Sequence, residues 1–163
     1  MKFKELISSV LEEFGKVFER VDEKQIEDFI DAIIKAKRIF VLGVGREGLS
    51  SRALAMRLMH LGKTVHWLWD DTTPAIGEGD LLIANSGSGN IMSVYHVAQR
   101  AKGIGASIAT ITANPGGNVA KISQVVVHLP AEVWGEGVDV VHSVQPMGCL
   151  FEQSLLILGY SFN

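Results

Sequence analysis

Apolar residues recur every three or four positions along the first 36 residues of the chain. This spacing places them on one side of a helix and predicts two amphipathic helices. The first stripe consists of Phe3, Leu6, Ile7, Val10, Leu11, Phe14, Val17 and Phe18. The second consists of Ile26, Phe29, Ile30, Ile33 and Ile34, and Asp22 in front of it is expected to cap the helix. We expect these N-terminal helices, residues 1–36, to pack on the core or on a partner subunit.

From residue 38 onward the pattern changes to short apolar runs, which are typical of buried strands. Five such runs occupy residues 38–43, 64–69, 81–85, 106–112 and 125–129. Helical patterns lie at about 49–61, at about 90–102, near 119 and from about 147 onward. This alternation predicts a parallel sheet with helices on both faces and ligands beyond the carboxyl ends of the strands. One long irregular segment, 131–145, interrupts the pattern.

Composition narrows the class of protein. The length of 163 residues and the hydrophobic content of 47% predict a single domain, 1–163, with a sizeable core. A formal net charge of −3 with scattered basic residues argues against nucleic acid as a partner. One cysteine, Cys149, and five histidines without ligand spacing predict neither a disulfide framework nor a metal site. The N-terminus is unlike a signal peptide and no apolar run reaches the ~18 residues of a membrane span, so we expect a cytoplasmic protein with no membrane contact.

Two serines alternate with two glycines directly after the third apolar run, in the segment Ser86-Gly87-Ser88-Gly89. Glycines allow backbone N–H groups to turn inward, serines add O–H donors, and the helix that follows adds unpaired N–H groups at its start. The segment contains no lysine and no P-loop spacing, which disfavours a nucleotide. We therefore expect a loop that binds the phosphate of a small metabolite.

A second glycine-rich segment, Gly43-Val44-Gly45-Arg46-Glu47-Gly48, follows the first apolar run. Its glycines fit G-x-G-x-x-G, and Asp70 and Asp71 lie near the distance at which a dinucleotide site has an acidic residue. A nicotinamide cofactor therefore stays open on spacing alone, as does a glycine turn that binds no ligand. The serine-glycine loop, which a dinucleotide would not explain, favours a sugar phosphate.

Several motifs in order resemble the SIS (sugar isomerase) family, and more narrowly its 6-phospho-3-hexuloisomerase branch. They are the two glycine-rich loops, Ala55 to Gly62, Thr72-Thr73-Pro74, Gly79-Asp80, Gln145-Pro146-Met147-Gly148 and Phe151-Glu152. The resemblance covers nearly the whole chain. It implies an α/β fold of the flavodoxin-like type: a three-layer αβα sandwich around a five-stranded parallel sheet, preceded by the N-terminal helices.

The resemblance also implies an activity, a site and an assembly. The activity is a cofactor-free isomerisation of 3-hexulose 6-phosphate to fructose 6-phosphate through an enediol, which needs a base and donors for the oxyanion. Glu152 is the expected base, although it also fits an ordinary acid in the first turn of a helix. His142, shortly before Gln145, is a second catalytic candidate. The expected sugar-phosphate ligands are Gly45, Arg46, Glu47, Ser86, Ser88 and Asn90, and the expected assembly is a homodimer or homotetramer with no metal.

Three departures from the family pattern support an alternative function. Glu47 stands where a serine is usual, and its carboxylate would repel a phosphate unless Arg46 neutralises it or it points away. Asn90-Ile91 replaces a polar pair; Asn90 is still expected to cap the next helix, but Ile91 cannot donate a hydrogen bond. The chain ends at Asn163, without the histidine-bearing tail usual in the family. The alternative is therefore a sugar-phosphate-binding or regulatory protein with reduced or no isomerase activity.

Overall fold

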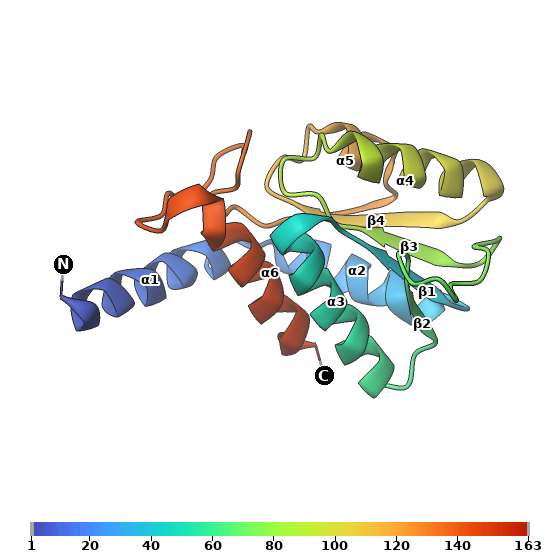
Figure 1. Ribbon diagram of the computed structural model, residues 1–163, viewed down its shortest axis with the longest axis horizontal. Helices are drawn as coiled ribbons and strands as arrows, with labels where there is room; N and C mark the ends of the chain where they lie inside the picture. The colour runs from blue at the N-terminus through green and yellow to red at the C-terminus, as the bar shows by residue number, and fades with distance from the viewer. Residues whose placement is uncertain (1, 163) are drawn as a thin grey trace.

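Five short strands form one parallel sheet in the computed structural model, which describes residues 2–162 (Figure 1). The strands are β1 (Ile39–Leu42), β2 (Val65–Trp67), β3 (Leu81–Ala84), β4 (Ser107–Thr112) and β5 (Val125–His128). Their order across the sheet is β2-β1-β3-β4-β5, and every neighbouring pair is parallel. This is the order of flavodoxin-like doubly wound sheets, which confirms the expected fold class.

Helices cover both faces of the sheet. They are α1 (Phe3–Phe18), α2 (Glu23–Lys35), α3 (Gly45–His60), α4 (Met92–Ile104), α5 (Asn118–Ile122) and α6 (Cys149–Ser161). Figure 1 shows α4 and α5 on one face, α2, α3 and α6 on the other, and α1 extending away from the sheet. None of the helices within residues 2–162 is both long enough and apolar enough to cross a membrane.

Two helix starts test the sequence-based expectations. Asp22 caps α2 as expected, because its side chain accepts the N–H groups of Lys24 at 2.7 Å and Gln25 at 3.3 Å. The helix α3 begins at Gly45, four residues before the expected start, so the first glycine-rich loop itself contributes the first helical turn. There the backbone of Gly48 packs closely on Gly43, where a Cβ on residue 48 would lie 3.1 Å from the Gly43 carbonyl oxygen.

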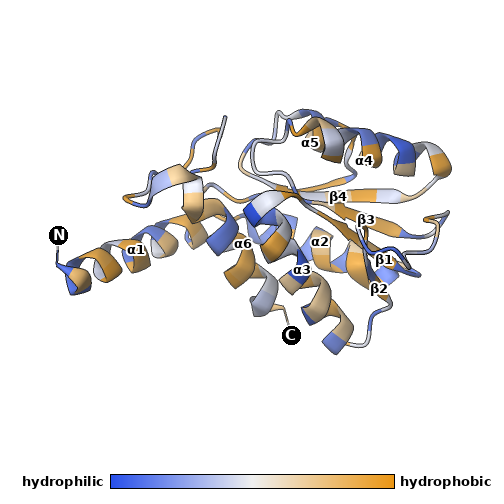
Figure 2. Cartoon of the chain, in the orientation of Figure 1, coloured by the Kyte–Doolittle hydropathy of each residue, from blue (hydrophilic) through white to orange (hydrophobic). Residues whose placement is uncertain are grey.

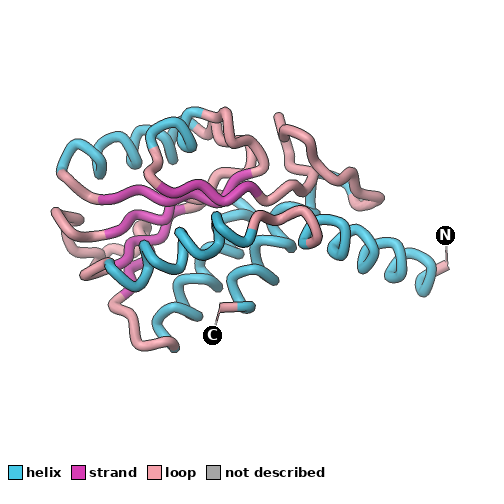
Figure 3. The backbone as a smooth tube through the Cα atoms, turned by 180° about the vertical axis from the view of Figure 1, so that it is seen from behind, coloured by secondary structure: helices cyan, strands magenta, loops and turns pink. Residues whose placement is uncertain are grey.

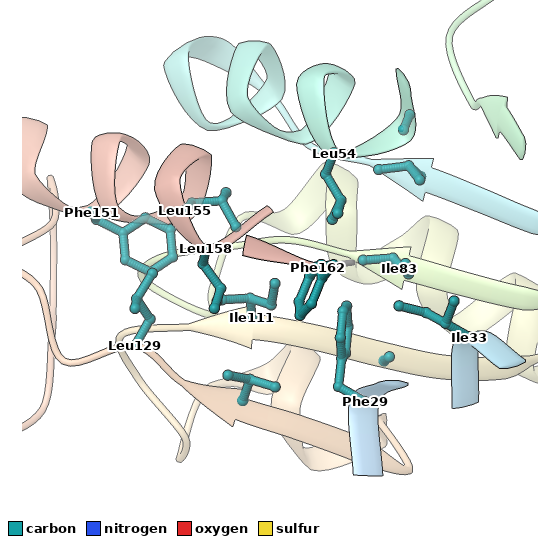
Figure 4. Close-up of a cluster of buried hydrophobic side chains, with 14 of the residues drawn as sticks. Phe29, Ile33, Leu54, Ile83, Ile111, Leu129, Phe151, Leu155, Leu158 and Phe162 are labelled. Atoms are coloured by element: carbon teal, nitrogen blue, oxygen red, sulfur yellow. The ribbon is translucent and has the colours of Figure 1, made fainter. Parts of the chain in front are cut away.

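The core consists of two layers, one on each face of the sheet. Alternate strand residues face opposite sides: Phe40, Leu42 and Leu82 pack toward α4 and α5, and Ile39, Val41 and Ile83 toward α2, α3 and α6. Figure 4 shows the second layer, in which Phe29 of α2 stacks on Phe162 with ring centroids 5.8 Å apart. In Figure 2 the apolar colouring continues along α1, beyond the sheet.

The irregular segment between β5 and α6 is held by α1. Figure 3 shows it as a long loop beyond the end of the sheet, beside that helix. Glu13 of α1 is buried and accepts two hydrogen bonds from this segment, from the Ser143 hydroxyl at 2.6 Å and the Val144 N–H at 2.7 Å. A carboxylate from the first helix therefore fixes a segment 130 residues later in the chain.

We predict that Glu13→Ala lowers the free energy of unfolding by about 2–4 kcal/mol, because two hydrogen bonds to a buried carboxylate are lost and the Val144 N–H loses its partner. Urea unfolding measures the change. The matched control is Glu12→Ala, which removes only an exposed ion pair with Lys16 and is expected to leave the free energy of unfolding almost unchanged. Equal losses in the two variants would contradict the role assigned to Glu13.

Candidate functional site

A cavity of about 350 Å³ opens beyond the carboxyl ends of β1 and β3. Four parts of the chain meet there: the start of α3, the loop after β3, the irregular segment and the start of α6. The lining residues are Val44, Gly45, Arg46, Glu47, Ser88, Ile91, Val133, Trp134, Met147 and Glu152. Parallel sheets bind ligands at this edge, and the sheet thus brings together most of the residues that the sequence singled out.

The serine-glycine loop is held in place from behind through its carbonyl groups. The Gly87 carbonyl accepts the Ala113 N–H at 2.9 Å and the Thr112 hydroxyl at 3.1 Å. The Ser88 carbonyl accepts the side-chain amide of Asn114 at 3.1 Å. Because these acceptors are bound on the β4 side, the loop has a fixed shape before any ligand arrives.

Donors of this loop stay without a partner among residues 2–162. The hydroxyl of Ser86 is fully buried and makes no hydrogen bond. The Ser88 N–H also makes no hydrogen bond among the described residues. Buried polar groups are nearly always paired, so unpaired donors in a rigid loop are suited to an anionic ligand.

The supporting side chains of the loop were not identified from the sequence. Asn85 is fully buried, donates to the Ser51 hydroxyl at 2.9 Å and accepts the Ile111 N–H at 3.3 Å. With Thr112 and Asn114, it belongs to a polar network at the strand ends. The feature of the sequence that could have identified these side chains is the position of small polar residues at the ends of apolar strands.

Arg46 joins the starts of α3 and α6. Its Nε donates to Glu152 Oε1 at 2.5 Å, and another guanidinium nitrogen donates to the Met147 carbonyl at 2.5 Å. The hydrogen bond to Glu152 raises the pKa of the arginine above its ordinary value. Glu152 itself is buried at the cavity wall, so its carboxylate is positioned by a fixed cation.

The backbone conformation of the Gln-Pro-Met-Gly motif makes the hydrogen bond between Arg46 and the Met147 carbonyl possible. Met147 has φ 65° and Gly148 has φ 67°, both in the left-handed region. At residue 148 a Cβ would lie 2.2 Å from the Trp134 nitrogen, so only glycine fits there. The resulting tight turn presents the Met147 carbonyl to Arg46 and packs the irregular segment against α6.

Glu47 binds the serine-glycine loop directly. Its Oε2 accepts the Gly87 N–H at 2.9 Å. Burial is the main cause that raises its pKa from 4.5 to about 7; the Gly87 hydrogen bond opposes this rise, and the Glu152 charge adds to it. Glu47 thus lies at the loop as expected of a site residue, but neither condition for avoiding repulsion of a phosphate is met, because Arg46 pairs with Glu152 and the Glu47 carboxylate points at the loop.

Three predicted site residues lie outside this cavity lining: His142, Asn90 and Ser86, whose hydroxyl is buried. The His142 side chain is 88% exposed, and its Nδ1 lies 3.3 Å from Glu132. The expectation that Asn90 caps the next helix is wrong: Ile91 occupies the cap position of α4, and Asn90 Oδ1 instead accepts the Asn118 N–H at 3.1 Å. The Asn90 side chain therefore links the loop to the start of α5.

Comparison with known proteins agrees with this geometry. Residues 32–157 match the SIS domain family, and the chain therefore belongs to that family. Among its relatives, a protein of Bacillus subtilis (strain 168) named 3-hexulose-6-phosphate isomerase is 34% identical over 157 residues, covering 96% of this chain and 85% of its own. A protein of the same name from Mycobacterium gastri is 42% identical over 153 residues, covering 93% and 76%.

A solved structure from Methanococcus jannaschii extends the agreement to the fold. It is 36% identical and superposes with a TM-score of 0.79 over 99% of this chain and 86% of its own. A molecular function of 3-hexulose-6-phosphate isomerase has been inferred for that protein. The expected family resemblance is thus confirmed.

We predict that the stability of the wild-type protein falls relative to that of Glu47→Gln as the pH rises from about 4.5 to about 7. The folded state keeps the Glu47 proton up to about pH 7, whereas the unfolded chain releases it near 4.5, so a rising pH favours unfolding in this window. The slope is at most about 1.4 kcal/mol per pH unit. Urea unfolding of both proteins at each pH measures it, and parallel stability curves would contradict a raised pKa at Glu47.

Proposed function

We propose that this chain is a 3-hexulose-6-phosphate isomerase that forms fructose 6-phosphate without a cofactor. One observation carries the proposal: the Glu152 carboxylate and the serine-glycine loop border the same cavity, with Arg46 between them. A base and an anion-binding loop that border one cavity fit a phosphorylated sugar that is held by its phosphate and deprotonated at carbon. The names of the relatives support the same reaction.

The proposed reaction moves a carbonyl group by one carbon. Glu152 takes the proton from C2 of the 3-ketose, and the C–H electron pair forms the C2–C3 double bond of an enediolate with its negative charge on O3. The proton on O2 moves to O3, and Glu152 returns its proton to C3, which leaves the carbonyl at C2. Arg46 supplies a cation beside the developing oxyanion, as electrostatic stabilisation requires.

The remaining site residues receive roles in binding. Ser88 and the N–H groups of its loop hold the phosphate, the buried Ser86 hydroxyl would reach it only after a shift of the loop, and Gly45 adds the start of α3, where helical N–H groups lack partners. Asn90 shapes the loop through its hydrogen bond with Asn118. His142 stays a predicted catalytic residue that would have to move from its exposed position to reach the cavity.

The proposal extends to the organisation of the protein. All five strands belong to one sheet, which supports a single SIS domain, 1–163, whose N-terminal helices, residues 1–36, pack on the core or on a partner subunit. A phosphorylated sugar does not cross membranes unaided because of its charge, so we place the reaction in the cytoplasm.

We predict that Glu152→Gln lowers kcat by about 10²–10⁴-fold, because the amide keeps the shape of the carboxylate but cannot accept the carbon-bound proton. The direct assay is exchange of the C3 hydrogen of fructose 6-phosphate in D₂O, followed by NMR, together with the coupled formation of fructose 6-phosphate. Glu78→Gln, an exposed position before β3 at the opposite edge of the sheet, is the control and should exchange at the wild-type rate.

The same assay separates the two candidate functions. The observation that favours a sugar-phosphate-binding or regulatory protein is the Glu47 carboxylate on the Gly87 N–H, where the phosphate loop needs a free donor. Fructose 6-phosphate that binds without any exchange in the wild-type protein would support that alternative and overturn the isomerase. Exchange that survives Glu152→Gln would instead overturn the choice of base.

We predict a homodimer or homotetramer in solution. Apolar side chains stay uncovered on α1 and α6, including Phe3 at 76% and Leu11 at 64% exposure, and such patches mark contact surfaces. Light scattering measures the mass. Leu11→Glu should lower it, whereas Ser8→Glu, which adds the same charge on the polar side of α1, should not. A monomeric wild-type protein would contradict the assembly.

A further inference from the structure

The first turn of α3 places a negative charge against the loop that is proposed to bind a phosphate. Glu47 Oε2 accepts the Gly87 N–H at 2.9 Å. Its other oxygen lies so close that a Cβ on residue 87 would be 2.7 Å from it. The carboxylate therefore lies directly on the loop and occupies one of the donors that an incoming anion would use.

The charges around Glu47 do not cancel its own. Within the described residues that line the cavity, Arg46 is the only cation, and it is bonded to Glu152. Glu152 on α6 adds a second negative charge, while the Cys149 thiol of the same helix has a raised pKa and is neutral near pH 7. Val133 and Trp134 face the cavity from the irregular segment and bring no charge.

We propose that Glu47 is a built-in competitor of the phosphate group: its ionised carboxylate holds the Gly87 N–H, and an anion binds the loop only when that carboxylate is protonated. This inference rests on the proposed function, because it takes the loop as the phosphate site. Two anions cannot share one N–H donor in a partly buried site without strong repulsion. Protonation of Glu47 removes the charge and weakens its hold on the loop.

The expected pH dependence follows from the fraction of protein that is competent to bind. The apparent Kd equals the intrinsic Kd divided by that fraction. With the pKa of Glu47 at about 7, the protonated fraction falls about tenfold between pH 6 and pH 8. Anion affinity should therefore weaken by about tenfold over this range.

Inorganic sulfate is the probe, because it remains a dianion over this range, whereas a phosphate ester titrates near pH 6. The ¹⁵N amide signals of Gly87 and Ser88 report binding in wild type, Glu47→Gln, Glu47→Ser and Glu78→Gln at pH 6, 7 and 8. We expect about tenfold weakening in wild type and Glu78→Gln, and no pH dependence in the two Glu47 variants. Glu47→Ser, which frees the Gly87 N–H, should bind most tightly.

Three outcomes would overturn the proposal. They are a sulfate affinity in wild type that does not change with pH, a pH dependence that persists in Glu47→Gln, and no sulfate binding to the loop in any variant. If Glu47→Ser does not fold, Glu47→Gln still decides, since it keeps the shape and removes the charge. The measurement needs no turnover, so its result is independent of the isomerase assay.

Discussion

The in-register pairing of β1 with β3 is the constraint on which the site depends. Ile39 lies opposite Leu81 and Leu42 opposite Ala84, so both strands end at the same level. The chain segments that leave them, the start of α3 and the serine-glycine loop, are therefore neighbours although 40 residues separate Glu47 from Gly87. The contact between Glu47 and the loop exists only because this ladder fixes the two ends relative to each other.

Features that depend on local pattern were predictable from the sequence. The alternation of apolar runs with helical stripes gave the five strands and their parallel sheet, and Asp22 gave the start of α2. The rule that parallel sheets bind ligands beyond their carboxyl ends then placed Arg46 and Ser88 at one edge, and the family resemblance added Glu152; all three line one cavity. Burial periodicity is a property of a few neighbouring residues, so one chain is enough to see it.

Features that depend on contacts between distant residues were not predictable. Glu13 lies next to the apolar stripe of α1, as many exposed acidic residues of helices do. Nothing in the neighbouring sequence indicates that it accepts a hydrogen bond from Ser143. The left-handed backbone at Met147 comes from the tight turn against the irregular segment and not from the residue type. Asn90 does not cap α4 because its side chain accepts a hydrogen bond from the Asn118 N–H of α5. Local spacing in the sequence cannot reveal this contact.

The hydrogen bonds between Glu13 and the irregular segment connect the cavity to a part of the chain that the family match does not include. Val133 and Trp134 line the cavity, and the segment that carries them is tied at Ser143 to α1. The family match begins at residue 32, after that helix has ended. The shared region thus carries the residues that line the cavity, while the segment that forms one wall is hydrogen-bonded to a helix outside that region. A fragment limited to the matched residues 32–157 would keep the residues that line the cavity. It would lose the hydrogen bonds from Glu13 that hold the segment carrying Val133 and Trp134.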